Sequence, residues 1–171
     1  MKRSGLIKVL VLLLFIFFPI LIYAAEIEDP YYKQWASFKI GSNVTLVGRA
    51  DDASGIASFT QTITLKEIAN DHLIIEISRI EEKVSPVAKK KKIDRFVYKT
   101  DKLEYNGQEE IPVAGKNALC QVYTLRIMDD SGKETITYKY WFNADIPGFT
   151  KVVATAGKAQ AVQTAVKWEK K

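Results

Sequence analysis

The side chains that could do catalytic chemistry are few and scattered in this sequence. There is one histidine, His72, and one cysteine, Cys120. A catalytic histidine needs a nucleophile and usually an orienting carboxylate beside it, but the neighbouring Asp71 would point to the opposite face if both lie in a strand. We therefore predict no catalytic residues and a protein that is not an enzyme. Hydrolase chemistry by scattered Ser, Asp and Lys residues is the alternative.

Metal binding and thiol chemistry are not favoured either. A zinc site would have to draw four ligands from one histidine, one cysteine and carboxylates. The segments 51–55 and 129–132 are rich in Asp, Ser and Gly, but they lack the ligand spacing of a calcium loop and have the composition of turns. Cys120 has no basic neighbour in sequence, which favours a packing role over a reactive thiol or an intermolecular disulfide. We predict no metal and no cofactor.

A run of lysines is the strongest local charge in the chain: Lys89, Lys90, Lys91 and Lys92. In a strand these side chains would point to both faces, so the segment cannot be buried. One interpretation is an exposed sheet edge that resists strand addition. The other is a patch for an anionic partner such as lipid head groups or acidic glycan. Nucleic-acid binding would need interleaved aromatic residues, and only Phe96 and Tyr98 follow, so no nucleic-acid partner is predicted.

A second group of side chains is aromatic. Tyr138, Tyr140 and Phe142 share one face of a predicted strand, with Trp141 on the other. If both faces are apolar, one meets the core and the other needs a cover. That cover is either a short helix predicted at 29–38 or a bound apolar ligand. The ligand-binding surface we predict consists of Trp35, Tyr138, Tyr140 and Trp141.

The N-terminal residues 1–25 have the three parts of a secretory signal. A basic start precedes an apolar stretch from Val9 to Ile22, and small residues follow at Ala24 and Ala25. We expect cleavage after Ala24 or Ala25. The stretch approaches the roughly 20 residues of a membrane span, so an uncleaved anchor is the alternative. Three of the 25 basic residues and none of the 20 acidic ones lie in this segment, which leaves a mature net charge of about +2.

The remaining residues, 26–171, are predicted to form one mainly β domain that is exported to the periplasm or the extracellular space. Apolar and polar residues alternate from residue 44 onward, with turn residues between the runs. We expect an antiparallel meander curled into a half barrel or barrel, with the helix 29–38 packed against it. The predicted strands are 44–50, 56–66, 72–82, 87–99, 109–113, 118–128, 134–143, 149–155 and 160–168.

Three features carry a resemblance: DPYYKQWASFKIGS at 29–42, the Thr-rich hairpin predicted at 56–82, and Trp141 leading into Asp145-Ile146-Pro147-Gly148 and Lys151. In these features the chain resembles small exported bacterial β-rich proteins of unassigned function. The resemblance covers most of the mature chain. In architecture alone it is similar to LolA/LolB-like half-barrel lipoprotein carriers. That similarity implies a concave apolar face, covered by helix, that opens for an acyl chain. Because little helix follows Phe38, we do not expect a roomy lidded cavity.

These observations give two functional hypotheses. The first is a non-enzymatic exported β domain that binds an apolar or amphipathic ligand in the cell envelope. The second is a structural or adaptor module that docks on another envelope component through its edge strands or the lysine run. The oligomeric state stays open.

Overall fold

The computed structural model describes residues 26–53, 55–81, 84–98 and 100–171. The predicted signal, residues 1–25, lies outside them. No helix among the described residues is both long and apolar enough to span a membrane. The elements are α2 (Pro30–Ala36), β1 (Asn43–Asp52), β2 (Gly55–Ile68), β3 (His72–Glu81), β4 (Val84–Asp94), β5 (Lys102–Val113), β6 (Lys116–Met128), β7 (Glu134–Phe142), β8 (Lys151–Ala156) and β9 (Ala159–Glu169).

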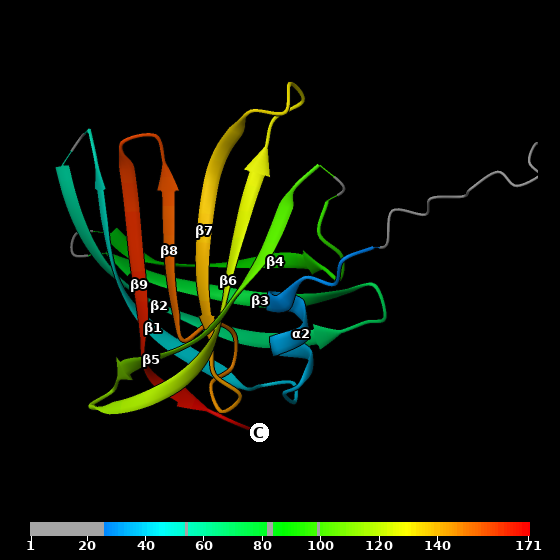
Figure 1. Cartoon of the computed structure of the whole chain (residues 1–171). Helices are drawn as coiled ribbons and strands as arrows, with labels where there is room; N and C mark the ends of the chain where they lie inside the picture. Colours follow the sequence, from blue (N-terminus) through cyan, green and yellow to red (C-terminus); the bar gives the residue numbers. More distant parts are fainter. Residues whose placement is uncertain (1–25, 54, 82–83, 99) are drawn as a thin grey trace, which may run out of the picture.

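The strands form one antiparallel sheet in the order β4-β3-β2-β1-β9-β8-β7-β6-β5. Strands β1 to β4 run as a meander from the centre to one edge, and the chain then crosses to the opposite edge. Strands β5 to β9 return as a second meander, until β9 pairs with β1. The sheet curls into a half barrel whose two edges are β4 and β5 (Figure 1). The predicted antiparallel half barrel is confirmed, and the joining of its two meanders at the centre is what the sequence did not indicate.

Strand β2 shows why the sheet has one buried face. Phe59, Ile63 and Leu65 are buried, while the intervening threonines are half-buried on the other face. The hydroxyl oxygen of one of these, Thr62, lies 3.0 Å from the hydroxyl oxygen of Thr45 on β1. Ile63 lies opposite Ile77 of β3, so the predicted β2–β3 hairpin is confirmed with its apolar residues on the concave face.

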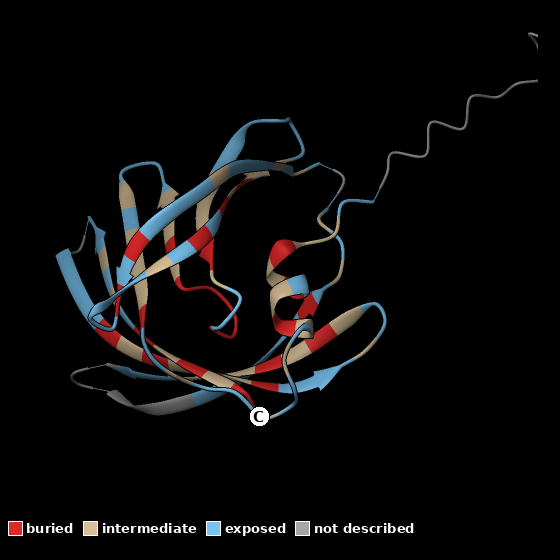
Figure 2. Ribbon diagram, turned by 60° about the horizontal axis from the view of Figure 1, so that its bottom comes forward, coloured by how far each residue is buried: buried red, intermediate tan, exposed pale blue. Residues whose placement is uncertain are grey.

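Helix α2 begins as its sequence predicts. The Asp29 carboxylate accepts a hydrogen bond of 2.7 Å from the Tyr31 amide, and Pro30 occupies the first turn. The helix lies on the concave side of the sheet (Figure 2), and its buried residues are Pro30, Tyr32 and Trp35. Trp35 is fully buried, and its indole ring lies so close to Gly148 that a Cβ atom there would be 2.8 Å from it.

Two side chains tie the helix to both halves of the sheet. The Tyr32 hydroxyl donates to the Ala69 carbonyl in the β2–β3 turn, at 2.8 Å. The Gln34 amide nitrogen donates to the carbonyls of Asn143 and Ile146, after β7, at 2.7 and 2.8 Å. The helix therefore bridges the first and second meanders at one end of the half barrel.

The outer face of β7 is covered by the β5–β6 hairpin. This hairpin has a bulge between Tyr105 and Gln108 and extends across β9, with which β5 is in contact (Figure 1). Val122 and Trp141 lie opposite each other there, and both are buried. The Trp141 indole N–H donates to the Glu109 carboxylate at 3.0 Å. One apolar face of β7 is thus closed by the protein itself.

Candidate binding cavity

The concave face holds a cavity of about 590 Å³ between the two meanders. Sites for small ligands span about 300–1,000 Å³, so this volume is of ligand size. The sequence led us not to expect a roomy lidded cavity; the cavity is roomy, but among the described residues no helix covers most of its length. The reason is that the helix covers only one end of the concave face, and the rest of the face is left without a cover of its own.

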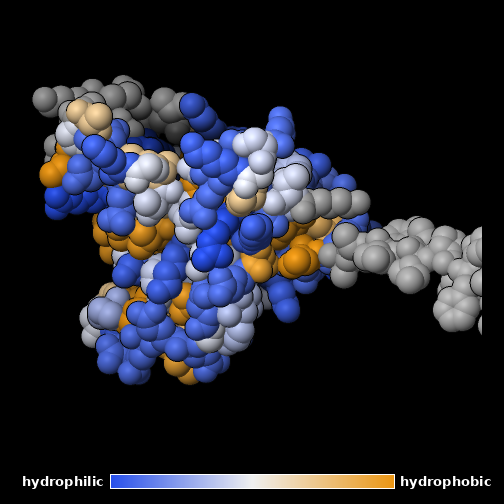
Figure 3. Space-filling model, turned by 45° about the horizontal axis from the view of Figure 1, so that its top comes forward, coloured by the Kyte–Doolittle hydropathy of each residue, from blue (hydrophilic) through white to orange (hydrophobic). Residues whose placement is uncertain are grey.

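Aliphatic side chains form two walls of the cavity, and they come from opposite sides of the sheet. β2 and β3 contribute one set and β6 and β7 the other, in each case residues that the antiparallel register sets side by side. These residues are Ile63, Ile75, Ile77, Leu125, Ile127 and Ile136. In Figure 3, apolar residues gather between hydrophilic ridges. The wall offers contact to an apolar chain and carries no charge.

Tyrosines line the end of the cavity nearest the helix. The rings of Tyr138 and Tyr140 stack with centroids 5.6 Å apart, and Tyr31 of the helix stacks on Tyr140 at 6.3 Å. Burial raises the pKa of Tyr140 well above its ordinary value, and the neighbouring Asp29 carboxylate raises it further. The pKa of Tyr31 is raised in the same way. These phenols stay neutral at physiological pH and act as apolar walls with polar tips.

Two amides interrupt the apolar floor. The Gln61 side-chain nitrogen on β2 donates to the Gln163 side-chain oxygen on β9, across the intervening strand β1. Both residues line the cavity, and Gln61 is buried. The pair satisfies part of its own hydrogen-bonding capacity, so the floor offers few polar groups to a ligand.

The mouth of the cavity is crossed by the segment that links the two edge strands. Residues 95–97 of this mouth segment run beside residues 27–29: the Glu28 and Phe96 backbones form a bridge, and the Val97 amide donates to the Ile27 carbonyl at 2.9 Å. Phe96, Val97 and Tyr98 all line the cavity. Arg95 holds the crossing in place through a 2.9 Å ion pair with Glu28.

Charged side chains gather on the β4 side of the mouth. Lys91 and Lys92 line it, with Lys92 3.1 Å from Asp94. Asp29 lies there too. Burial raises the pKa of its carboxyl, the helix amides lower it, and the positive charge of Lys91 lowers it to a smaller extent. The mouth therefore combines an apolar rim with a charged side, where Lys91 and Lys92 lie near Asp29 and Asp94.

The residues predicted for the binding surface separate into two groups. Tyr138 and Tyr140 line the cavity, whereas Trp35 is buried beneath the helix and Trp141 lies on the outer face. There the Lys139 and Lys151 ammonium groups lie 4.7 and 4.8 Å from the Trp141 ring centroid. Neither tryptophan can contact a ligand in the cavity in this arrangement.

The predicted lysine patch is likewise divided. All four lysines are exposed and lie in the edge strand β4, as the edge interpretation expected, but only Lys91 and Lys92 reach the mouth. The sequence analysis missed Tyr31, Gln61 and Gln163. Tyr31 could have been found from its place beside the predicted helix cap, whereas the two glutamines meet only through the pairing of β9 with β1.

The residues first considered for catalysis form no catalytic group with one another in the described structure. His72 Nδ1 lies 2.7 Å from the Asp71 carboxylate, contrary to our expectation that these side chains point apart, because Asp71 belongs to the turn before β3. Cys120 is buried, and burial raises the pKa of its thiol. The Asp129 carboxylate accepts bonds from the Ser131 and Lys133 amides, as in a hairpin turn. Among the described residues, no group of acidic, His and Cys side chains could hold a metal ion.

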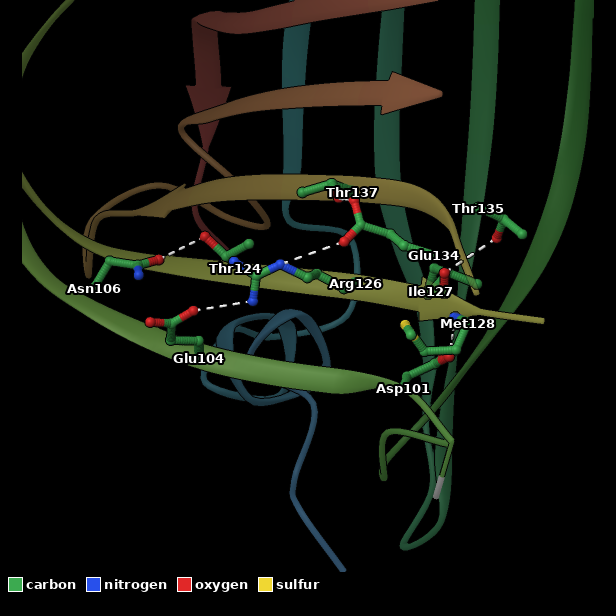
Figure 4. Close-up of polar contacts among 10 residues, drawn as sticks. All are labelled: Asp101, Glu104, Asn106, Thr124, Arg126, Ile127, Met128, Glu134, Thr135 and Thr137. Atoms are coloured by element: carbon green, nitrogen blue, oxygen red, sulfur yellow. Dashed lines mark hydrogen bonds and ion pairs between the residues drawn. The ribbon is translucent and has the colours of Figure 1, made fainter. Parts of the chain in front are cut away.

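The densest polar cluster outside the cavity is structural. Arg126 on β6 pairs with Glu104 of β5 at 3.1 Å and with Glu134 of β7 at 3.6 Å (Figure 4). Beside it, the Thr124 hydroxyl donates to the Asn106 side chain at 2.6 Å. These residues alternate along β6 with those that line the cavity, so they lie on the opposite face. Half-exposed ion pairs of this kind add modest stability and tie the three strands together.

Neither a protein-family model nor a curated protein sequence matches the chain. Among solved structures, it is similar to the MucA/MucB complex of Pseudomonas aeruginosa (10% identity over 82% of this chain and 56% of that one, TM-score 0.49). It is also similar to a putative outer membrane lipoprotein-sorting protein domain from Vibrio parahaemolyticus (7% identity over 81% of this chain and 89% of that one, TM-score 0.43). A third similar structure is the hypothetical lipoprotein YmcC from Escherichia coli (11% identity over 98% of this chain and 98% of that one, TM-score 0.39).

The chain spans little more than half of the MucB structures that it matches. The outcome agrees with the resemblance drawn from the sequence: no family is assigned, and lipoprotein-sorting and lipoprotein structures are among the matches. At these identities and TM-scores we take nothing about function from them, and we build the function on this chain's own geometry.

Proposed function

We propose that residues 26–171 form an exported, non-enzymatic domain that binds the acyl chain of an amphipathic ligand in the concave cavity. The observation that carries this proposal is the 590 Å³ space between two aliphatic walls. At about 30 Å³ per water-sized group, it has room for roughly 20 such groups. The expected site of action is the cell envelope, in the periplasm or outside the cell.

The walls set the expected affinity. Burial of a methylene contributes about 0.8 kcal/mol, so about ten buried methylenes contribute about 8 kcal/mol before ordering costs. Without those costs this would correspond to a dissociation constant of about 1 μM, so about 1 μM is the tightest binding we expect from the walls alone. The polar end of such a ligand would lie at the mouth, because the apolar walls and the paired floor amides offer it few partners.

Native mass spectrometry and lipid extraction of protein purified from its own host test the proposal. We expect a co-purifying amphiphile, and reversible binding of a fluorescent fatty acid after its removal. Replacing Ala154 with Trp fills the cavity, since Ala154 lines its wall, and should weaken fatty-acid binding at least tenfold. Ala156→Trp is the matched control, because Ala156 is exposed at the end of the same strand.

Two results would contradict the binding of an acyl chain in the cavity. One is ligand-free protein from the host that also fails to bind the fatty acid. The other is equal binding by the Ala154→Trp and Ala156→Trp variants when circular dichroism shows both to be folded.

The alternative function is docking on another envelope component through the β4 edge. Its supporting observation is that β4 has a partner strand on one side only and presents four exposed lysines. Crosslinking in cells, with Lys89 to Lys92 replaced by serine, tests it. Loss of a crosslinked partner supports docking, and unchanged partners contradict the role of the lysines.

A further inference from the structure

We propose that the mouth of the cavity docks on an anionic lipid bilayer. This goes beyond ligand binding, since a ligand could also reach the cavity from water or from another protein. The first observation is that three large apolar side chains at the mouth are exposed: Ile27 at 50%, Phe96 at 37% and Tyr98 at 71%. Clustered exposed apolar side chains mark contact surfaces for a membrane or a partner.

These side chains stand on a fixed support. Besides the Glu28–Phe96 bridge, the Asp29 amide donates to the Arg95 carbonyl at 2.8 Å, and the Arg95 amide donates to the Asp71 carbonyl at the same distance. The mouth segment is therefore held between the N-terminal residues and the β2–β3 turn region. Phenylalanine and tyrosine on such a support are suited to head-group depth, where aromatic rings are enriched.

The charge beside this rim favours an anionic surface. Lys89, Lys90 and Lys91 are exposed along β4, and none forms an ion pair within the described residues. Four acidic groups near the mouth have partners: Asp94 pairs with Lys92, Glu28 pairs with Arg95, the Asp29 carboxyl caps the helix, and Asp101 accepts from the Met128 amide. Glu26, next to Ile27, is exposed. Each basic side chain close to an anionic bilayer strengthens binding roughly fivefold.

The position of the N-terminus points the same way. Ile27 lies at the rim, so the apolar stretch from Val9 to Ile22 is joined to this rim by a few residues. In Figure 3, apolar residues gather where the described chain begins. The apolar rim, the chain entry and Lys91 thus lie together at the mouth, and Lys89 and Lys90 precede Lys91 on the same edge strand.

The test uses the full chain exported by its host, with a fluorophore attached through Tyr98→Cys or, as control, Ile56→Cys. Ile56 is 59% exposed and lies at the β1–β2 turn, away from the mouth (Figure 1). The native Cys120 is buried and stays unlabelled. We add vesicles of phosphatidylcholine, with or without phosphatidylglycerol, that carry brominated acyl chains. Quenching should occur at position 98 with phosphatidylglycerol and be weak at position 56.

A triple replacement tests the lysines. Changing Lys89, Lys90 and Lys91 to serine should weaken quenching at position 98 by more than tenfold in lipid concentration. The control replaces Lys116, Lys158 and Lys167, which are also exposed and give the same change in net charge, and should leave quenching unchanged.

Equal quenching at positions 98 and 56, or none at either, would overturn the proposal. So would equal effects of the two triple replacements. Fatty-acid binding by the soluble protein is measured separately, so the failure of membrane docking is distinguishable from the failure of ligand binding.

Discussion

Gly148→Ala should be one of the most destabilising single-methyl changes in this protein. Gly148 has a φ of +68°, a conformation that costs a residue with a side chain about 1–2 kcal/mol. A Cβ atom there would also lie 2.8 Å from two carbons of the Trp35 indole. Trp35 is fully buried, so its ring has little space in which to move, and overpacking costs about 1–3 kcal/mol.

These two contributions give an expected loss of about 2–5 kcal/mol in the free energy of unfolding. The measurement is urea denaturation followed by tryptophan fluorescence and circular dichroism. Gly157→Ala is the matched control, because Gly157 has a φ of +59° and no atom within 4 Å of the added methyl group. That variant should lose only the conformational part, about 1–2 kcal/mol.

Trp35→Leu should partly relieve the contact. The combined loss in the double variant Trp35→Leu/Gly148→Ala should therefore be smaller than the sum of the single losses. If Gly148→Ala costs no more than Gly157→Ala, or if the double variant is additive, Trp35 does not fix the helix against the β7–β8 connection as we infer. The helix carries Tyr31 of the cavity wall, so the folded Gly148→Ala protein should also bind fatty acid more weakly.

Three further predictions address the remaining elements. Trp141→Phe should lower the free energy of unfolding by about 1–3 kcal/mol, because the hydrogen bond to Glu109 is lost. A fatty-acid titration should show unchanged binding. Weaker binding would mean that Trp141 belongs to the ligand site. Burial raises the folded-state pKa of Asp29 above 3.8, so the folded state holds the proton more tightly, and stability should fall as pH rises from 3.8 through that raised pKa. Urea titrations across acidic pH should show that Asp29→Asn abolishes this fall. Hydrogen bonds from Ser131 and the turn amides lower the pKa of Asp129, so its contribution has the opposite sign: it should be lost as pH falls through the lowered pKa, and Asp129→Asn should remove it.

The sequence predicted the bounds of a strand well where one face of that strand is buried. It predicted them less well where both faces are exposed. The alternation in β2 and β3 located that hairpin to within a few residues. β5 begins at Lys102, not at the predicted residue 109, because its first half is largely exposed and polar and lacks an apolar period. The predicted strand 87–99 ends at Asp94, since residues 95–97 pair with residues 27–29, a contact between distant segments that no local pattern indicates.

The site was predictable only in part, for a related reason. The two faces of β7 could be assigned from alternation, and Tyr138 and Tyr140 do share a face opposite Trp141. Which of the faces is open depends on the cover of each, and the cover of Trp141 is a hairpin that crosses from the far edge of the sheet. The sequence pattern predicted that Trp35 lies on a helix face packed on the sheet. Because Trp35 is buried in that packing, it does not line the cavity.

Element length explains why a cavity exists at all. Helix α2 has 7 residues, which at about 1.5 Å per residue span about 10 Å. Strand β3, which it contacts, is much longer: it has 10 residues, about 33 Å at about 3.3 Å per residue. A helix that short can cover only one end of the concave face, and no further helix follows it among the described residues. The outer face of β7 is covered by a full hairpin and is filled, whereas the concave face beyond the helix stays open along aliphatic walls. The small amount of helix, from which we expected no roomy lidded cavity, is thus the physical cause of an open one.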